Sequence, residues 1–224
     1  GKIDMNKVHY IITGVNLEDF YTDRDAHPRK DEDINRKDIF KIIYMGSVSY
    51  VNQVQVLVDA AALMRRDERY RFFIYGDGTY RDDLEKYVNE HNCNNIILKE
   101  RRIPFNEVAW VVSQATVNVM TYKKGFGCLG MGSGKTLQYL AAAKPILCNV
   151  EIRYDDFITE NNIGIAHDIE TPEELSAAIR QLAEQPKDAY DAMCERCKKV
   201  SERFDYKVLA AEEIRVIESA LSSI

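Results

Sequence analysis

The chain has 224 residues, of which 46% are hydrophobic and 29% are charged, which suits one large domain with a sizeable core, with or without appended helices. A net charge of -6 and the lack of a basic cluster argue against a nucleic-acid-binding surface. The longest apolar runs are far too short to span a bilayer, and no signal-peptide pattern stands at the start of the sequence.

The cysteines and histidines do not form a recognisable metal or disulfide pattern. The five cysteines are Cys93, Cys128, Cys148, Cys194 and Cys197. This odd, sparse set predicts a reduced, cytoplasmic location. Cys194 and Cys197 have C-x-x-C spacing, but they lie in a charged helical pattern without a second pair, so we interpret the spacing as chance. The histidines show no ligand spacing, and we expect no metal and no cofactor.

The first 38 residues alternate between apolar and charged segments. Lys7–Ile12 (KVHYII) is predicted to be a strand from its β-branched and aromatic content, and residues 13–16 to be a turn. Asp23–Asp38 is highly charged, with one proline and few apolar side chains, which predicts a surface loop.

Two strand–helix units follow. Phe40–Met45 (FKIIYM) has the composition of a buried strand and is followed by a glycine turn. Apolar residues at i, i+3, i+4 and i+7 from Val54 predict an amphipathic helix. Arg71–Tyr75 (RFFIY) is the next predicted strand, closed by a glycine-rich turn at residues 76–78. Apolar positions in residues 84–88 mark the second helix.

Two arginines follow the predicted short strand Asn95–Leu98. In open α/β sheets, ligands bind outside the carboxyl ends of the strands, so Arg101 and Arg102 are placed where an anion or a nucleobase edge would meet them. Ordinary surface arginines fit the same pattern equally well. Pro104 begins a predicted helix that runs through Val112.

The stretch Tyr122–Pro145 (YKKGFGCLGMGSGKTLQYLAAAKP) holds the clearest chemical signal. It follows the predicted strand Thr116–Met120, is dense in glycine up to Gly134, and becomes helical in pattern at Lys135. The first N–H groups of a helix have no intrahelical partners and the helix dipole favours negative charge there, while glycine lets the backbone approach a phosphate. We therefore expect a phosphorylated ligand at this helix.

The alternation of strands and helices continues to the end of the chain. The remaining predicted elements are the strands Ile146–Val150 and Ile163–Ala166 and the helices Asp155–Thr159, Thr171–Leu182, Lys187–Phe204 and Asp205–Ser222. The last helix has an apolar stripe, which predicts that it packs against a neighbour. This order predicts an α/β fold with a mostly parallel sheet, helices on both faces and C-terminal helices appended.

A P-loop is one interpretation of the glycine-rich stretch. Gly134-Lys135-Thr136 matches the end of that motif, but the position that needs the first glycine holds Leu129, and Gly130 is one residue late. About ten residues also separate the motif from the preceding strand, whereas a P-loop follows its strand directly. A P-loop phosphotransferase remains a minor alternative.

A different family fits more of the chain. Residues 132–145 (GSGKTLQYLAAAKP) resemble the S-P-S-K-x-x-E-Y-M-A-A-G-K-P segment of group 1 retaining GT-B glycosyltransferases, and residues 75–86 (YGDGTYRDDLEK) resemble their G-D-G-P-x-R-x-x-L-E segment. Residues 11–20 resemble the I-P-N-G-V-D-x-x-x-F phrase that opens the donor domain. The motifs keep their order from about Val8 to about Ile217. The resemblance implies that residues 1–224 form one Rossmann-like domain, the C-terminal half of a GT-B fold.

The resemblance also implies a reaction and a set of site residues. A sugar would pass with retention from a nucleotide-diphospho-sugar, which is a co-substrate, to an acceptor of the cell-surface glycan or polysaccharide type, without a metal. Lys135 would stabilise charge on the leaving diphosphate as a catalytic residue, and Gln138 would hold the ribose at the position of the family's glutamate. The implied donor-binding residues are Gly46, Ser47, Asn52, Gly76, Arg102, Ile103, Gly134, Thr136 and Leu137.

Departures from the family pattern keep a second hypothesis open. Ser47 and Asn52 replace an arginine and a lysine that hold the donor diphosphate, and Gly130 replaces a glutamate. A degenerate, non-catalytic nucleotide-binding or scaffold domain is therefore the alternative. By the resemblance, the partner is an N-terminal acceptor domain absent from this chain, through which peripheral membrane contact could occur. We expect the chain to be inactive by itself, with no nucleic-acid partner.

Overall fold

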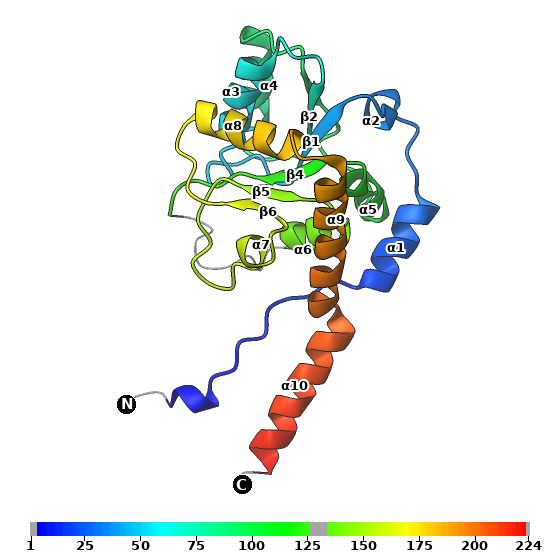
Figure 1. Ribbon diagram of the computed structural model, residues 1–224, viewed down its shortest axis with the longest axis vertical. Coiled ribbons are helices and arrows are strands. Elements are labelled where there is room, and N and C mark those ends of the chain that lie inside the picture. Colours follow the sequence, from blue (N-terminus) through cyan, green and yellow to red (C-terminus); the bar gives the residue numbers. More distant parts are fainter. Residues whose placement is uncertain (1–3, 126–133, 223–224) are drawn as a thin grey trace.

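The computed structural model describes residues 4–125 and 134–222 (Figure 1). The sequence features at Cys128, Leu129, Gly130 and residues 132–133 lie outside the described residues. In the described part, six strands form one sheet in the order β3-β2-β1-β4-β5-β6, and all neighbouring strands are parallel. The strands are β1 (Phe40–Met45), β2 (Tyr70–Tyr75), β3 (Ile96–Leu98), β4 (Val117–Met120), β5 (Ile146–Cys148) and β6 (Gly164–Ala166).

Helices cover both faces of this sheet (Figure 1). They are α1 (Leu17–Ala26), α2 (Glu32–Asn35), α3 (Val54–Met64), α4 (Arg81–Glu90), α5 (Phe105–Ser113), α6 (Gly134–Ala141), α7 (Phe157–Glu160), α8 (Pro172–Ala183), α9 (Lys187–Ser201) and α10 (Tyr206–Leu221), with 3-10 turns at Met5–Lys7 and Glu202–Phe204. Helices α3, α4 and α8 share one apolar core, and α1, α5, α6, α7 and α9 share the other. The predicted α/β architecture is confirmed.

Neighbouring residues of the central strands point to opposite faces of the sheet, which explains why these strands are mostly apolar. Ile42 and Tyr44 of β1 point into the core with α3 and α8, whereas Ile43, between them, points to the face covered by α5. Phe72 and Phe73 of β2 divide in the same way. Because successive side chains of a strand face opposite sides, a strand covered on both faces is apolar at most positions. The buried exceptions Lys41 of β1 and Asn118 of β4 donate to backbone oxygens, Ile34 O at 2.7 Å and Val112 O at 3.1 Å.

Two predictions for the first 38 residues were wrong. Lys7–Ile12 does not form a strand: residues 7–10 are exposed, and no strand of the described residues pairs with this segment. β-propensity needs a neighbouring strand to be realised. Asp23–Asp38 is not a continuous loop, because α1 runs to Ala26 and α2 lies within it. The side chain of Asp31 accepts from Ile34 N at 3.3 Å and caps α2.

Contrary to the prediction, the apolar stripe of α10 packs against no neighbour within the part of the chain that the structure describes. Ile214, Ile217 and Leu221 are exposed by 54%, 52% and 65%, and Leu209, in the first turn, is the buried residue of this helix. Figure 1 shows most of α10 projecting away from the sheet, while its first turn meets α1, where Lys207 Nζ lies 2.7 Å from Glu18 Oε2. Within residues 4–125 and 134–222, no helix is long and apolar enough to cross a membrane.

Candidate functional site

The carboxyl ends of the strands and the start of α6 lie at the same edge of the sheet. The strand order reverses between β1 and β4, and both strands end at this edge. Such a reversal opens a crevice where open α/β sheets bind their ligands. Helix α6 begins at Gly134 and places Lys135 in its first turn, beside the end of β1.

Lys135 is a cation held between aromatic rings. Its Nζ lies 4.8 Å from the centroid of the Tyr44 ring and 5.2 Å from that of Tyr122. A Cβ added to Gly46 would lie only 3.1 Å from this Nζ, so glycine leaves room for the ammonium. Burial lowers the pKa of Lys135 from its ordinary 10.5 to about 8. Among the described residues, no carboxylate or hydrogen-bond acceptor pairs with this ammonium, which makes it a ready partner for an anion.

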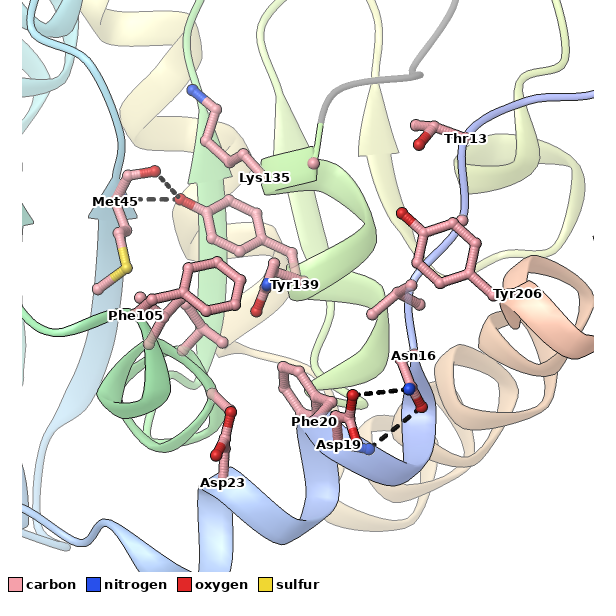
Figure 2. A pocket seen from close by; sticks show the side chains of 17 residues that line it. Thr13, Asn16, Asp19, Phe20, Asp23, Met45, Phe105, Lys135, Tyr139 and Tyr206 are labelled. Carbon is pink, nitrogen blue, oxygen red and sulfur yellow. Dashed lines mark hydrogen bonds between the residues drawn. The ribbon is translucent and has the colours of Figure 1, made fainter.

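A buried tyrosine fixes α6 against the end of β1. The Tyr139 hydroxyl accepts from Met45 N at 2.7 Å and donates to Met45 O at 3.1 Å, as Figure 2 shows. Burial raises the pKa of Tyr139 well above its ordinary range, so the hydroxyl keeps its proton. The Thr136 hydroxyl lies 3.3 Å from Met120 Sδ and faces the core. These contacts hold Lys135 at a fixed place beside β1.

The turn after β1 uses its polar groups internally. Gly46 N donates to Tyr75 O at 3.1 Å, which extends the pairing of β1 with β2. Ser47 O accepts from the Tyr44 hydroxyl at 2.7 Å and from Asn52 Nδ2 at 2.9 Å. Asn52 Nδ2 also contacts Ser49 Oγ at 3.0 Å. The Asn52 side chain therefore stabilises the turn.

Gly76 allows the second turn to pack on the first. A Cβ at this position would lie 1.8 Å from Gly46 O, an impossible distance. Gly76 N donates to Glu100 O at 3.2 Å. Its role in this structure is close packing of two neighbouring turns.

The other predicted donor-binding residues take different positions. The Arg102 side chain is 86% exposed, and its Nε lies 3.3 Å from Asp77 Oδ2. Ile103 packs against the apolar core around α5, and Thr136 and Leu137 are buried. None of these four lines the cavity beside Lys135, whereas Gly134, Lys135 and Gln138 do.

A cavity of about 620 Å³ adjoins Lys135 and Gln138. Helices α1, α5 and α6, residues 13–16 and Tyr206 enclose it, and Figure 2 shows Phe105 and Phe20 on its walls. Asp19 and Asp23 add carboxylates from α1; Asp19 Oδ2 accepts from Asn16 Nδ2 at 2.7 Å. The Gln138 side chain forms no hydrogen bond within the described residues and is available to a ligand in this cavity.

Sequence reasoning missed several residues of this cavity. Asn16, Asp19, Asp23, Phe105 and Tyr206 come from segments that are far apart in the sequence. Two signals were available: the family phrase at residues 11–20 contains Asn16 and Asp19, and the spacing of Asp19 and Asp23, one helical turn apart, places both on one face of α1. Within the described parts of the chain, no group of three or more His, Cys, Asp or Glu side chains could hold a metal ion.

A family model described as "Glycosyl transferases group 1" matches residues 39–185, which is more than half of the chain. The chain belongs to the group 1 glycosyltransferases. The matched region includes the turn after β1, the turn after β2 and α6. No curated protein matches the chain in sequence.

Solved structures similar to this chain have the same fold. HepE from Anabaena, in complex with UDP, is 14% identical with a TM-score of 0.73, and the match covers 96% of this chain and 57% of HepE. Sucrose-phosphate synthase from Thermosynechococcus elongatus is 16% identical with a TM-score of 0.74, over 96% and 53%. WaaG, a glycosyltransferase involved in lipopolysaccharide biosynthesis, is 16% identical with a TM-score of 0.69, over 90% and 55%.

The chain thus spans little more than half of each of these three structures. Its six-stranded parallel sheet with helices on both faces matches one Rossmann-like half of the GT-B fold and is like the C-terminal domain. The predicted family and fold class are confirmed. At these identities, the likeness to individual structures concerns the fold.

Proposed function

We propose that this chain is the donor-binding half of a glycosyltransferase that moves a sugar, with retention, from a nucleotide-diphospho-sugar to an acceptor of the cell-surface glycan or polysaccharide type. The ammonium of Lys135, unpaired among the described residues and set at the start of α6, is the observation that supports this function. Lys135 is half-buried, and a cation that has lost part of its water without a partner costs stability. The UDP bound to the similar structure HepE is a ligand of the proposed class.

The geometry suggests how the chain would assist the reaction. When the bond between the anomeric carbon and the phosphate oxygen breaks, negative charge develops on the leaving diphosphate. Lys135 and the dipole of α6 are preorganised to stabilise that charge. Gln138, one turn further along α6, offers its amide to the ribose hydroxyls. Phe105, which is 76% exposed at the cavity, provides an apolar surface for the nucleobase.

The acceptor site and any membrane contact would belong to another part of the whole enzyme. We propose that residues 1–224 are paired with an N-terminal acceptor domain, which completes the cleft and supplies any membrane contact, and that the enzyme is cytoplasmic. Without that domain, the chain is expected to bind the donor and not to transfer the sugar. A same-face displacement needs no covalent nucleophile and no metal from this half.

The test is calorimetry of the purified chain with UDP, GDP and UDP-sugars, with and without magnesium. We expect metal-independent binding of a nucleoside diphosphate, weakened by Lys135→Ala. Lys187→Ala is the matched control, because this lysine is 86% exposed on α9 and pairs with Asp191. Tight binding of ATP only with magnesium would contradict the proposal and favour a P-loop phosphotransferase, although β4 ends at Met120, well before α6.

A degenerate, non-catalytic domain is the second candidate function. It is favoured by Ser47 and Asn52, whose groups bond within their own turn and offer no cation to a diphosphate. In its scaffold form, this alternative predicts no binding of any nucleoside diphosphate, even when the acceptor domain is present. Binding of UDP that depends on Lys135 would exclude a domain that has lost its donor site.

A further inference from the structure

A second cavity, of about 540 Å³, lies between α3 and α4 and the turns that precede them. These two helices are neighbours on one face of the sheet (Figure 1). The wall combines the aromatic rings of Tyr50 and Tyr80 with the polar side chains of Gln55, Asp59 and Asp83. We refer to this cavity as the α3–α4 groove. None of these side chains belongs to the site around Lys135.

Two large aromatic side chains are left exposed at this groove. Tyr50 is 53% exposed and Tyr80 is 46% exposed, and their ring centroids are 6.4 Å apart with the planes at 37°. Rings in this arrangement do not bury each other. A tyrosine ring exposes much apolar area to water, so a pair beside a hollow is a typical contact surface for a ligand with an apolar face.

The two tyrosines are held in place by the backbone. Val48 N donates to Asp77 O at 2.9 Å, and Tyr80 N donates to Val48 O at 3.1 Å, which joins the two turns. Lys123 Nζ lies 3.8 Å from the Tyr50 ring centroid and covers one face of that ring. The surface is therefore preformed, which lowers the entropy cost of binding.

The polar side of the groove is acidic and rich in acceptors. Gln55 and Asp59 are one turn apart on α3, and Asp83 and Tyr87 are one turn apart on α4. The Tyr87 hydroxyl donates to Asp59 Oδ1 at 2.5 Å. Of the described residues that line the groove, none is Lys, Arg or His. Although Lys123 lies over the Tyr50 ring, Asp59 and Asp83 line the groove itself and repel a phosphate, so this groove is unsuited to a second nucleotide.

We propose that the α3–α4 groove binds an uncharged oligosaccharide. A pyranose ring has an apolar C–H face, which would lie on Tyr50 or Tyr80, and hydroxyl groups, which would donate to Asp59 and Asp83 and exchange hydrogen bonds with the Gln55 amide. The preference for a glycan over other uncharged ligands rests on the proposed function. The turn after β1 reaches Lys135 at Gly46 and the groove at Tyr50, so the groove holds a glycan chain next to the donor site.

The experiment titrates the full chain with cello-, malto- and manno-oligosaccharides at millimolar concentration and, separately, with UDP, by calorimetry and amide NMR. We expect one series to bind and to shift the amide signals of the two turns. Tyr50→Ala and Tyr80→Ala should each weaken that binding about tenfold and leave UDP binding unchanged. Lys135→Ala should weaken UDP binding and leave oligosaccharide binding unchanged. The proposals for the groove and for the donor site can therefore be contradicted independently.

Tyr154→Ala is the matched control, because Tyr154 is a 51% exposed tyrosine paired with Tyr10 at a distant place. Asp83→Asn, at an exposed position, tests the acidic side without removing an aromatic ring and should also weaken binding. The proposal is overturned if no oligosaccharide series binds, or if binding survives both tyrosine substitutions. Binding of a lysine-rich peptide at Tyr50 and Tyr80 in place of any sugar would overturn it as well.

Discussion

The turn after β1 and the start of α6 meet at the same edge of the sheet, and their polar groups behave in opposite ways. In the turn, Ser47 O receives two hydrogen bonds from side chains of the same segment, Tyr44 and Asn52. At the start of α6, the Lys135 ammonium lies over the rings of Tyr44 and Tyr122 and has no hydrogen-bond acceptor among the described residues. Both segments contain a glycine at this edge, Gly46 in the turn and Gly134 at the first position of α6. The comparison shows that unsatisfied polar groups, and not the glycines, distinguish a ligand site from a structural turn.

The largest effect is expected at Lys135. Lys135→Met should weaken UDP binding about a hundredfold, because a charge-assisted contact to a phosphate is worth about 2–3 kcal/mol. The same change should raise the free energy of unfolding by about 1–3 kcal/mol, because it removes a desolvated cation from the folded state. Calorimetry and urea unfolding measure the two effects. A variant that loses both affinity and stability would show that Lys135 is structural.

A smaller effect is expected at Gln138. Gln138→Glu should strengthen UDP binding about three- to tenfold at neutral pH, because a carboxylate forms stronger hydrogen bonds with the ribose hydroxyls than an amide does. Gln181→Glu, on the exposed face of α8, is the control for the added charge. If both variants bind UDP as the unmodified chain does, Gln138 does not contact the ribose.

The smallest effect on binding is expected in the turn after β1. Asn52→Ala removes the bonds to Ser47 O and Ser49 Oγ, so it should lower the free energy of unfolding by about 1 kcal/mol. UDP affinity should change by less than about threefold, because Asn52 carries no charge to the diphosphate. A loss as large as that at Lys135 would mean that the two segments do not differ in role.

The sequence predicted the sheet well for a physical reason. Phe40–Met45 was predicted with the bounds that β1 has, because burial on both faces favours a mostly apolar run, here interrupted by Lys41 alone. Lys7–Ile12 has similar composition, but it lacks a neighbouring strand, which local composition cannot reveal. The spacing of Ile214, Ile217 and Leu221 predicts an apolar face on α10, but spacing cannot show whether another element covers that face.

The site was predictable only in part. Lys135 and Gln138 follow from one local motif, and both line the cavity. Phe105 and Tyr206 join that cavity only through tertiary packing of α5 and α10, which no local pattern indicates. Asn52 stands at the position of a donor-binding lysine of the family, but its hydrogen bonds to Ser47 O and Ser49 Oγ depend on the shape of the turn.

The most direct test of the central claim is the titration of Lys135 itself, by NMR of the chain with labelled lysine side chains, alone and with saturating UDP. The account predicts a pKa of about 8 in the free chain, because burial disfavours the charged form. UDP should raise this pKa, because the diphosphate stabilises the ammonium, and by linkage UDP affinity should fall as pH rises above about 8. The same pKa with and without UDP would contradict the assignment of Lys135 to the diphosphate.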